Sequence, residues 1–181
     1  MLRPYGKTDE GEMDFREFVH TGPETIAGRY LRRFWQPVCC SHEIASGQAL
    51  PLRILGGEFT LYRGASGSVY LIGNRCAHRG TQLSAGWVEG DCIRCFYHGW
   101  KYDGSGQCVE QPAEGESFAQ KVRVPSYAVQ EYIGLVFAYL GDGEPPPLSR
   151  YPKFEDPEIS LDVAGLRRIC NYFNNIENSL D

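Results

Sequence analysis

Apolar and polar residues alternate along the middle of the chain. From residue 50 onward, apolar residues occupy every second position in three short runs: Leu52 and Ile54, Phe59 and Leu61, and Val69 and Leu71. Gly56-Gly57 and the segment 65–68 supply turn residues between these runs. Alternation with a period of two, bounded by turn residues, is typical of antiparallel strands that bury one face. The pattern predicts a mostly β fold built on an antiparallel sandwich.

The alternation resumes after residue 100. Trp100-Lys101-Tyr102 predicts a short strand, 103–106 a turn, and the apolar run 133–139 a long strand that closes the sheet. In such a sandwich the intervening loops lie at the tips of hairpins, where a rigid scaffold holds them near the surface.

Two segments have helical spacing instead. In 25–35, Ile26, Tyr30 and Phe34 fall on one face after the cap-like segment 21–24, which predicts a short amphipathic helix that packs these side chains into the core. In 169–181, apolar residues recur every three to four positions and predict a second helix with a polar stripe. A solvated face is the simplest interpretation of that stripe. A short strand is expected near 159–163.

A proline run divides the chain. Pro145-Pro146-Pro147 follows two glycines and cannot continue a sheet, so it predicts a stiff extended spacer. The expected units are an N-terminal arm and helix that pack on the next unit (1–45), a β domain (46–143), a proline-rich linker (144–152) and the incomplete beginning of an α+β domain (153–181).

Composition and charge narrow the function. The 181 residues carry a formal charge of −5 without basic clusters, so nucleic acid is not an expected partner. No apolar run approaches the 18 residues of a membrane span, and the first residues do not resemble a signal peptide. Seven cysteines without a secreted spacing pattern are typical of reduced thiols. These features predict a cytoplasmic protein that does not bind membranes.

Candidate chemistry is concentrated in two short loops. Cys76-Ala77-His78-Arg79-Gly80 and Cys95-Phe96-Tyr97-His98-Gly99-Trp100 each offer one thiolate and one imidazole. Two cysteines and two histidines suit a [2Fe–2S] cluster with two nitrogen ligands on one iron, whose potential lies at roughly −150 to +300 mV. Gly80 and Gly99 suit tight loops whose backbone N–H groups turn towards the cluster sulfides.

A structural zinc site is the alternative for these four residues. Zinc also binds two cysteines and two histidines, and Cys92 with Cys95 has the spacing of half a zinc knuckle. A single residue between Cys76 and His78 is unusual for zinc, however. Spacing therefore favours the iron–sulfur interpretation, in which Cys92 could still lie close to the cluster.

The two loops resemble the signature of Rieske proteins, Cys-x-His, sixteen residues, then Cys-x2-His. The resemblance implies that Cys76 and Cys95 bind the inner iron and that His78 and His98 bind the outer one. Thr81 and Tyr97 stand where respiratory Rieske proteins have disulfide cysteines, so the resemblance is to the soluble Rieske proteins.

Three residues beside the predicted ligands allow two interpretations each. Trp100 and Tyr97 could exclude water from a cluster or could fill space under a loop, and packing is the simpler expectation for Tyr97. Arg79 could face a partner protein or could be solvated, and the sequence does not separate these alternatives.

The flanking segments resemble Rieske oxygenases, in particular the phthalate-dioxygenase-like group of terminal oxygenase subunits. Residues 32–38 resemble their entry segment, and 175–181 resemble the beginning of the helix that carries the catalytic iron. Asp181 would then be the aspartate that bridges the Rieske histidine of one subunit to the iron site of its neighbour. The histidines and the carboxylate of a facial triad are absent from this sequence, so a mononuclear Fe(II) is expected only in the missing part of the catalytic domain.

The resemblance implies electron transfer from an NAD(P)H-dependent reductase, through the cluster, to a mononuclear iron. That iron would activate O2 to hydroxylate or demethylate an aromatic or related organic substrate, and the subunits would form a head-to-tail homotrimer. The alternative is a stand-alone electron carrier of the Rieske ferredoxin kind. The helix at 25–35, the proline spacer and the tail argue against it, because such carriers are little longer than the sandwich.

Overall fold

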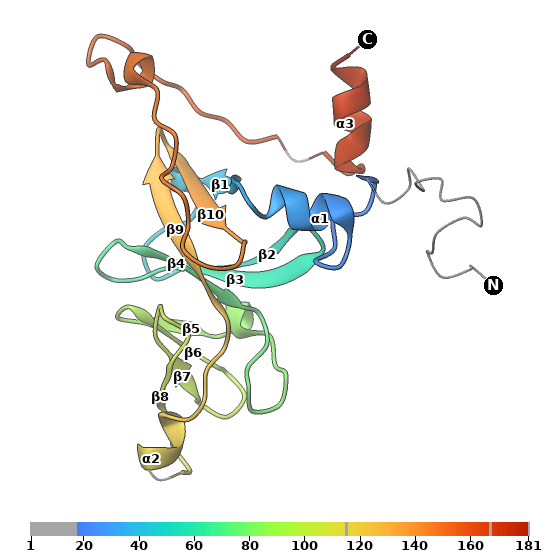
Figure 1. The fold of residues 1–181 in the computed structure, drawn as a ribbon. Helices are drawn as coiled ribbons and strands as arrows, with labels where there is room; N and C mark the ends of the chain where they lie inside the picture. Colours follow the sequence, from blue (N-terminus) through green and yellow to red (C-terminus); the bar gives the residue numbers. More distant parts are fainter. Residues whose placement is uncertain (1–17, 115, 167, 181) are drawn as a thin grey trace, which may run out of the picture.

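The chain forms two antiparallel sheets joined by loops and short helices (Figure 1). This computed structural model describes residues 18–114, 116–166 and 168–180. The larger sheet has six strands in the order β1-β10-β9-β4-β3-β2. Its strands are β1 (Trp35–Cys40), β2 (Ala49–Ile54), β3 (Gly57–Arg63), β4 (Val69–Gly73), β9 (Ser126–Tyr132) and β10 (Leu135–Tyr139). The predicted mostly β, antiparallel fold is confirmed.

The smaller sheet lies below the larger one in Figure 1 and carries the segment of the predicted ligands. Its four strands pair in sequence order: β5 (Trp87–Glu89), β6 (Cys92–Arg94), β7 (Lys101–Tyr102) and β8 (Cys108–Glu110). The short helix α2 (Glu116–Ala119) follows β8. A 3-10 helix (Leu83–Ala85) precedes β5.

Two-residue turns set the register of the large sheet. Leu55 and Gly56 join β2 to β3, and Ile133 and Gly134 join β9 to β10, all with positive φ. Positive φ at both positions is the geometry of type I′ turns, whose twist matches that of paired strands. The predicted strand from 133 therefore begins two residues later, because Ile133 and Gly134 form the turn.

Each sheet has its own buried core. The core of the large sheet is mainly aliphatic and aromatic: Ile44, Phe59, Leu61, Leu71, Val136, Ala138 and Leu140. The core of the small sheet contains three cysteines together with larger side chains: Cys76, Cys95, Cys108, Trp100, Tyr102, Tyr62, Ile72, Leu83 and Ile93 among others. Sulfur and aromatic rings therefore concentrate under the predicted ligand loops.

Helix α1 (Ile26–Leu31) is shorter than predicted because the chain turns after Arg32 and enters β1 at Trp35. The Thr25 hydroxyl caps the helix by accepting a hydrogen bond from the Gly28 amide. The expectation that its apolar face packs into the core is wrong. Ile26, Tyr30 and Phe34 are exposed, and the Tyr30 and Phe34 rings pack edge to face on each other at 5.1 Å.

The C-terminal segment contains helix α3 (Tyr172–Asn178), which begins after the capping residue Asn171, later than the apolar spacing predicted. The strand expected near 159–163 is not formed, and this segment is mostly exposed, so no neighbouring strand is available for pairing. Residues 145–150 lack helix and strand, as expected for a proline-rich spacer, while the domain boundaries stay predictions. Short 3-10 helices occupy Ser41–Glu43 and Pro152–Glu155. Among the described residues, no helix has the length and apolar character needed to cross a membrane.

Candidate metal centre

The two predicted ligand loops share one backbone frame. In the first, the Cys76 amide donates to the Thr81 carbonyl, and the Gly80 amide donates to the Cys76 carbonyl, both at 2.8 Å. In the second, the Cys95 amide donates to the Trp100 carbonyl and the Gly99 amide to the Cys95 carbonyl, at 2.8 and 3.0 Å. Each frame thus spans six residues with a glycine at the fifth position.

Gly80 and Gly99 have φ values of 68° and 74°, a region that side chains with a Cβ rarely adopt. This conformation lets each loop turn back on its cysteine within six residues. The expectation from sequence that these glycines serve tight loops therefore agrees with their backbone geometry.

The thiols of Cys76 and Cys95 form the buried side of the site. The two residues are 3% and 1% exposed, and their side chains interact with each other without a disulfide. Burial raises the pKa of the Cys76 thiol, and hydrogen bonds from Tyr102 and the His78 backbone oppose that rise. The Tyr102 hydroxyl lies 3.3 Å from Cys76 Sγ and accepts a hydrogen bond from the Ala77 amide at 3.1 Å.

The imidazoles of His78 and His98 form the outer side. Their ring centroids are 4.5 Å apart, with the rings inclined at 70°. His78 Nδ1 is buried and has no hydrogen-bond partner, whereas His98 is exposed. Partial desolvation, followed by repulsion from His78 and Arg79, lowers the pKa of His98. A lowered pKa favours neutral imidazole, which is the form that binds metal.

Aromatic rings enclose the imidazoles. The buried Trp100 stacks on His78, with centroids 4.7 Å apart and an angle of 10° between the rings. Tyr97 is 56% exposed, so the expectation that it fills space under its loop is wrong. Its ring lies 3.8 Å from the His98 ring and covers it on the solvent side. Arg79 is exposed beside them.

Arg94 anchors the second loop and was not identified from the sequence. It immediately precedes Cys95, and its Nη1 donates to the Gly99 carbonyl at 2.7 Å. The same guanidinium pairs with Glu89 and Glu110 through bonds of 2.8–3.0 Å, and these carboxylates raise its pKa. Lys101 lies 3.5 Å from both carboxylates. The pairing could not be read from sequence spacing, because Glu110 is sixteen residues from Arg94.

The donor set fits a two-iron cluster better than a single ion. The four side chains form a buried sulfur pair and an outer nitrogen pair, and a Rieske cluster takes two sulfur ligands on one iron and two nitrogen ligands on the other. Within the residues that the structure describes, no three His, Cys, Asp or Glu side chains are grouped to hold one ion. A structural zinc site needs four ligands around one ion, so the geometry does not support that alternative.

The sequence singled out two other residues, Asp181 and Cys92. Asp181 lies outside the described residues. Cys92 begins β6, where Asp91, Lys101 and Asp103 surround it, and it is absent from the buried core around Cys76. The third cysteine of that core is Cys108.

Comparisons with known proteins agree with this geometry. The family described as "Rieske [2Fe-2S] domain" matches residues 34–132. The oxygenase subunit of 3-chlorobenzoate-3,4-dioxygenase from Comamonas testosteroni is 37% identical over 172 residues, which is 93% of this chain and 40% of that protein. The oxygenase subunit of 5,5'-dehydrodivanillate O-demethylase from Sphingobium is 34% identical over 170 residues, or 91% of this chain and 40% of that one. The chain thus spans about 40% of the length of these relatives.

Solved structures show the same likeness. The oxygenase–ferredoxin complex of carbazole 1,9a-dioxygenase matches with a TM-score of 0.60 and 37% identity, covering 70% of this chain and 34% of the other. Dicamba monooxygenase matches with a TM-score of 0.64 and 30% identity, covering 71% and 42%. The family match spans both ligand loops, and the chain therefore belongs to the Rieske [2Fe-2S] family.

Proposed function

We propose that Cys76 and Cys95 bind one iron of a [2Fe–2S] cluster and that His78 and His98 bind the other. The observation that carries this assignment is the buried, unpartnered Nδ1 of His78, whose ring lies beside a second imidazole, together with two buried thiols that interact with each other. A buried nitrogen without a partner costs about 1–3 kcal/mol, and a metal ion would supply the missing partner.

The bound cluster would supply one-electron transfer, at a potential raised by its two neutral nitrogen ligands. The protein's own residues set its surroundings. Trp100 stacks on the His78 ring and Tyr97 lies against the His98 ring, and the Tyr102 hydroxyl, 3.3 Å from Cys76 Sγ, would donate to a metal-bound thiolate there. Arg94 fixes the backbone between His98 and Trp100 by binding the Gly99 carbonyl.

We further infer that this chain is the Rieske part of a terminal oxygenase subunit. Support comes from the relatives, which are named as oxygenase subunits of dioxygenases, a demethylase and a monooxygenase. The activity proposed for the whole protein is O2-dependent hydroxylation or demethylation of an aromatic or related organic substrate. A mononuclear Fe(II) would carry that reaction, at a site formed by residues beyond this sequence.

The partners proposed for the whole protein follow from the same likeness. A redox protein is the proposed electron donor, since a matched structure holds an oxygenase with its ferredoxin. An NAD(P)H-dependent reductase as the source of electrons, a head-to-tail homotrimer, the bridging role of Asp181 and a cytoplasmic location are finer proposals. They rest on the sequence resemblance.

The deciding measurement is the iron and acid-labile sulfide content after anaerobic purification. The 181-residue chain should contain two irons and two sulfides. The natural full-length product should contain three irons to two sulfides, because the mononuclear site adds one iron. A ratio of two to two in that product would support the electron carrier instead, and iron-free protein that binds one zinc would refute both.

The same preparation tests the ligands. In a His98→Cys variant that retains its cluster, the potential should fall, because a thiolate adds negative charge at the outer iron. His42→Cys is the matched control, since His42 is an exposed residue in the 3-10 helix Ser41–Glu43 of the large-sheet half. An unchanged potential in His98→Cys would contradict the assignment of His98.

A further inference from the structure

Gln111 has a buried side chain whose hydrogen bonds are not made by the protein. The residue is 6% exposed, and neither its Nε2 nor its Oε1 has a partner. Among the described residues, the only other buried side-chain nitrogen or oxygen in this state is Nδ1 of His78. Buried amides almost always have partners, because leaving one unpaired costs about 1–3 kcal/mol. Both unsatisfied side chains therefore indicate a missing group.

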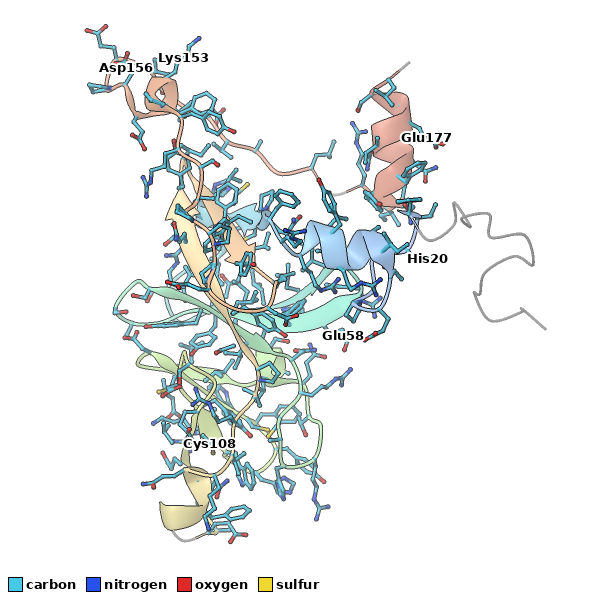
Figure 2. The ribbon with its side chains drawn as sticks, viewed as in Figure 1. His20, Glu58, Cys108, Lys153, Asp156 and Glu177 are labelled. Atoms are coloured by element: carbon cyan, nitrogen blue, oxygen red, sulfur yellow. The ribbon has the colours of Figure 1, made fainter. Side chains whose placement is uncertain are left out.

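The position of Gln111 links it to the ligand loops. It directly follows β8, and the ring of the next residue, Pro112, packs so closely on the second loop that a Cβ at Gly99 would lie 3.0 Å from it. On its other side lies Cys108, which is 1% exposed and shares a buried core with Cys76 and Cys95. Figure 2 shows Cys108 within the small sheet. The Gln111 segment thus covers the cluster-binding region from the β8 side.

One buried thiol lies beside the amide. The Gln111 side chain lies close enough to the Cys108 thiol to lower its pKa, although burial has the larger, opposite effect, and the contact lacks the geometry of a hydrogen bond. Cys108 in turn interacts electrostatically with Cys76. Nearby Gln107 behaves differently, because its Nε2 donates to the carbonyls of Cys108, Ala119 and Val122. The same residue type is fully satisfied at 107 and unsatisfied at 111.

A solvent cavity is the other source of a partner. A cavity of about 430 Å³ lies between β8 and α2, and Cys108, Gln111 and Ala119 are among its lining residues. Both polar atoms of the Gln111 amide are nevertheless buried. An ordered water bonded to the amide would leave the reduction potential of the cluster unchanged, whereas a hydrogen bond from the amide to the cluster would raise it.

We propose that the Gln111 side chain donates an N–H hydrogen bond to a sulfur atom of the [2Fe–2S] cluster and thereby raises its reduction potential. This inference rests on the proposed ligands. Reduction adds negative charge to the cluster, and a donor aimed at its sulfur stabilises the reduced form more than the oxidised form. Gln111 is a positioning and tuning residue in this role, and it does not bind iron.

The test compares the reduction potentials of Gln111→Met and Gln107→Met with that of the unmodified chain, each loaded with its cluster. Methionine nearly preserves the shape of glutamine and removes the donor. Loss of one such bond in Gln111→Met should shift the equilibrium for one-electron reduction roughly tenfold, which lowers the potential by about 59 mV. Gln107→Met should lower the melting temperature, because three hydrogen bonds are lost, and should leave the potential unchanged.

A second measurement detects the hydrogen bond directly. In the reduced chain labelled with amide-15N glutamine, pulsed electron paramagnetic resonance should detect a 15N coupling and an exchangeable proton, and Gln111→Met should lose both. If Gln111→Met kept the native potential and the labelled unmodified chain lacked these couplings, the inference would be overturned. The partner of the amide would then be water. If the unmodified chain had no Rieske spectrum at all, the proposed function itself would fail, so the two failures are distinguishable.

Discussion

The two ligand loops have the same backbone and different anchors. Each closes a six-residue frame with two hydrogen bonds and a glycine of positive φ. The anchor of the first loop is a neutral group, the Tyr102 hydroxyl, which contacts both Cys76 Sγ and the Ala77 amide. The second is held from the side by Arg94 and its two carboxylates. The same backbone frame therefore forms with either kind of anchor, a neutral hydroxyl or a charged guanidinium.

This difference separates the sensitivities of the two loops. A neutral phenol in the core has no charge for salt to screen and does not titrate in mild acid. Burial raises the pKa of Tyr102 further, which keeps the phenol neutral in base as well. A partly exposed network of charges responds to both. We therefore expect salt, acid and substitutions of charged residues to loosen the second loop, which carries the exposed His98, before the first.

The largest effect is expected from Arg94→Ala. It removes the bond to the Gly99 carbonyl and leaves Glu89 and Glu110 with Lys101 but without their guanidinium partner, which should cost about 2–3 kcal/mol and release the cluster at least about tenfold faster. The measurement is the loss of visible absorbance in the presence of an iron chelator.

Arg63→Ala is the matched control for that experiment. Arg63 is about as buried as Arg94 and binds Glu131 through two bonds of 2.8 and 2.9 Å, but it lies in the large sheet. Its loss should lower the stability of the chain by a similar amount without accelerating cluster release from folded protein. Equal release rates in the two variants would contradict the role of Arg94.

A smaller effect should distinguish the glycines of the two frames. Alanine at either position pays about 1–2 kcal/mol for the left-handed backbone. At Gly80 a Cβ meets nothing within 4 Å, whereas at Gly99 it lies 3.0 Å from the Pro112 ring. Gly99→Ala should therefore destabilise the chain by about 1 kcal/mol more than Gly80→Ala in urea unfolding. Equal destabilisation by the two variants would show that the loop 111–114 shifts easily to admit the added methyl group.

The smallest effect is a dependence on pH. Hydrogen bonds from Arg94 lower the pKa of both Glu89 and Glu110 in the folded chain. Their contribution is complete above the unfolded value of about 4.3 and is lost as the pH falls through the lowered folded value. Glu110→Gln should thus release its cluster faster than the unmodified chain at pH 7, with the ratio approaching one as the pH falls below the lowered folded value. A ratio that stays constant with pH would show that the charge is unimportant.

Much of this arrangement could be predicted from local pattern. Alternating residues indicated β2, β3 and β4, and the turn glycines indicated where they end. The motif of Cys76, His78, Cys95 and His98 indicated the family because its spacing is unusual for other metals. Local signals succeed here because strands, turns and ligand loops are each specified within a few residues.

The anchors could not be predicted in this way. Tyr102 and Arg94 act across hairpins, and a tyrosine or arginine in a short strand has no signal of its own. Gln111 was missed because unsatisfied burial is a property of the three-dimensional structure. The strand expected at 159–163 failed for the same reason, since an apolar segment becomes a strand only where a partner strand is available.

The shared six-residue frame forms regardless of where in the loop the histidine stands. Histidine stands at the third position of the first loop and at the fourth of the second, yet the backbone bonds are the same. The same backbone frame therefore accommodates its histidine at either of two positions. A designed metal site could therefore use this six-residue frame and place its histidine at either position.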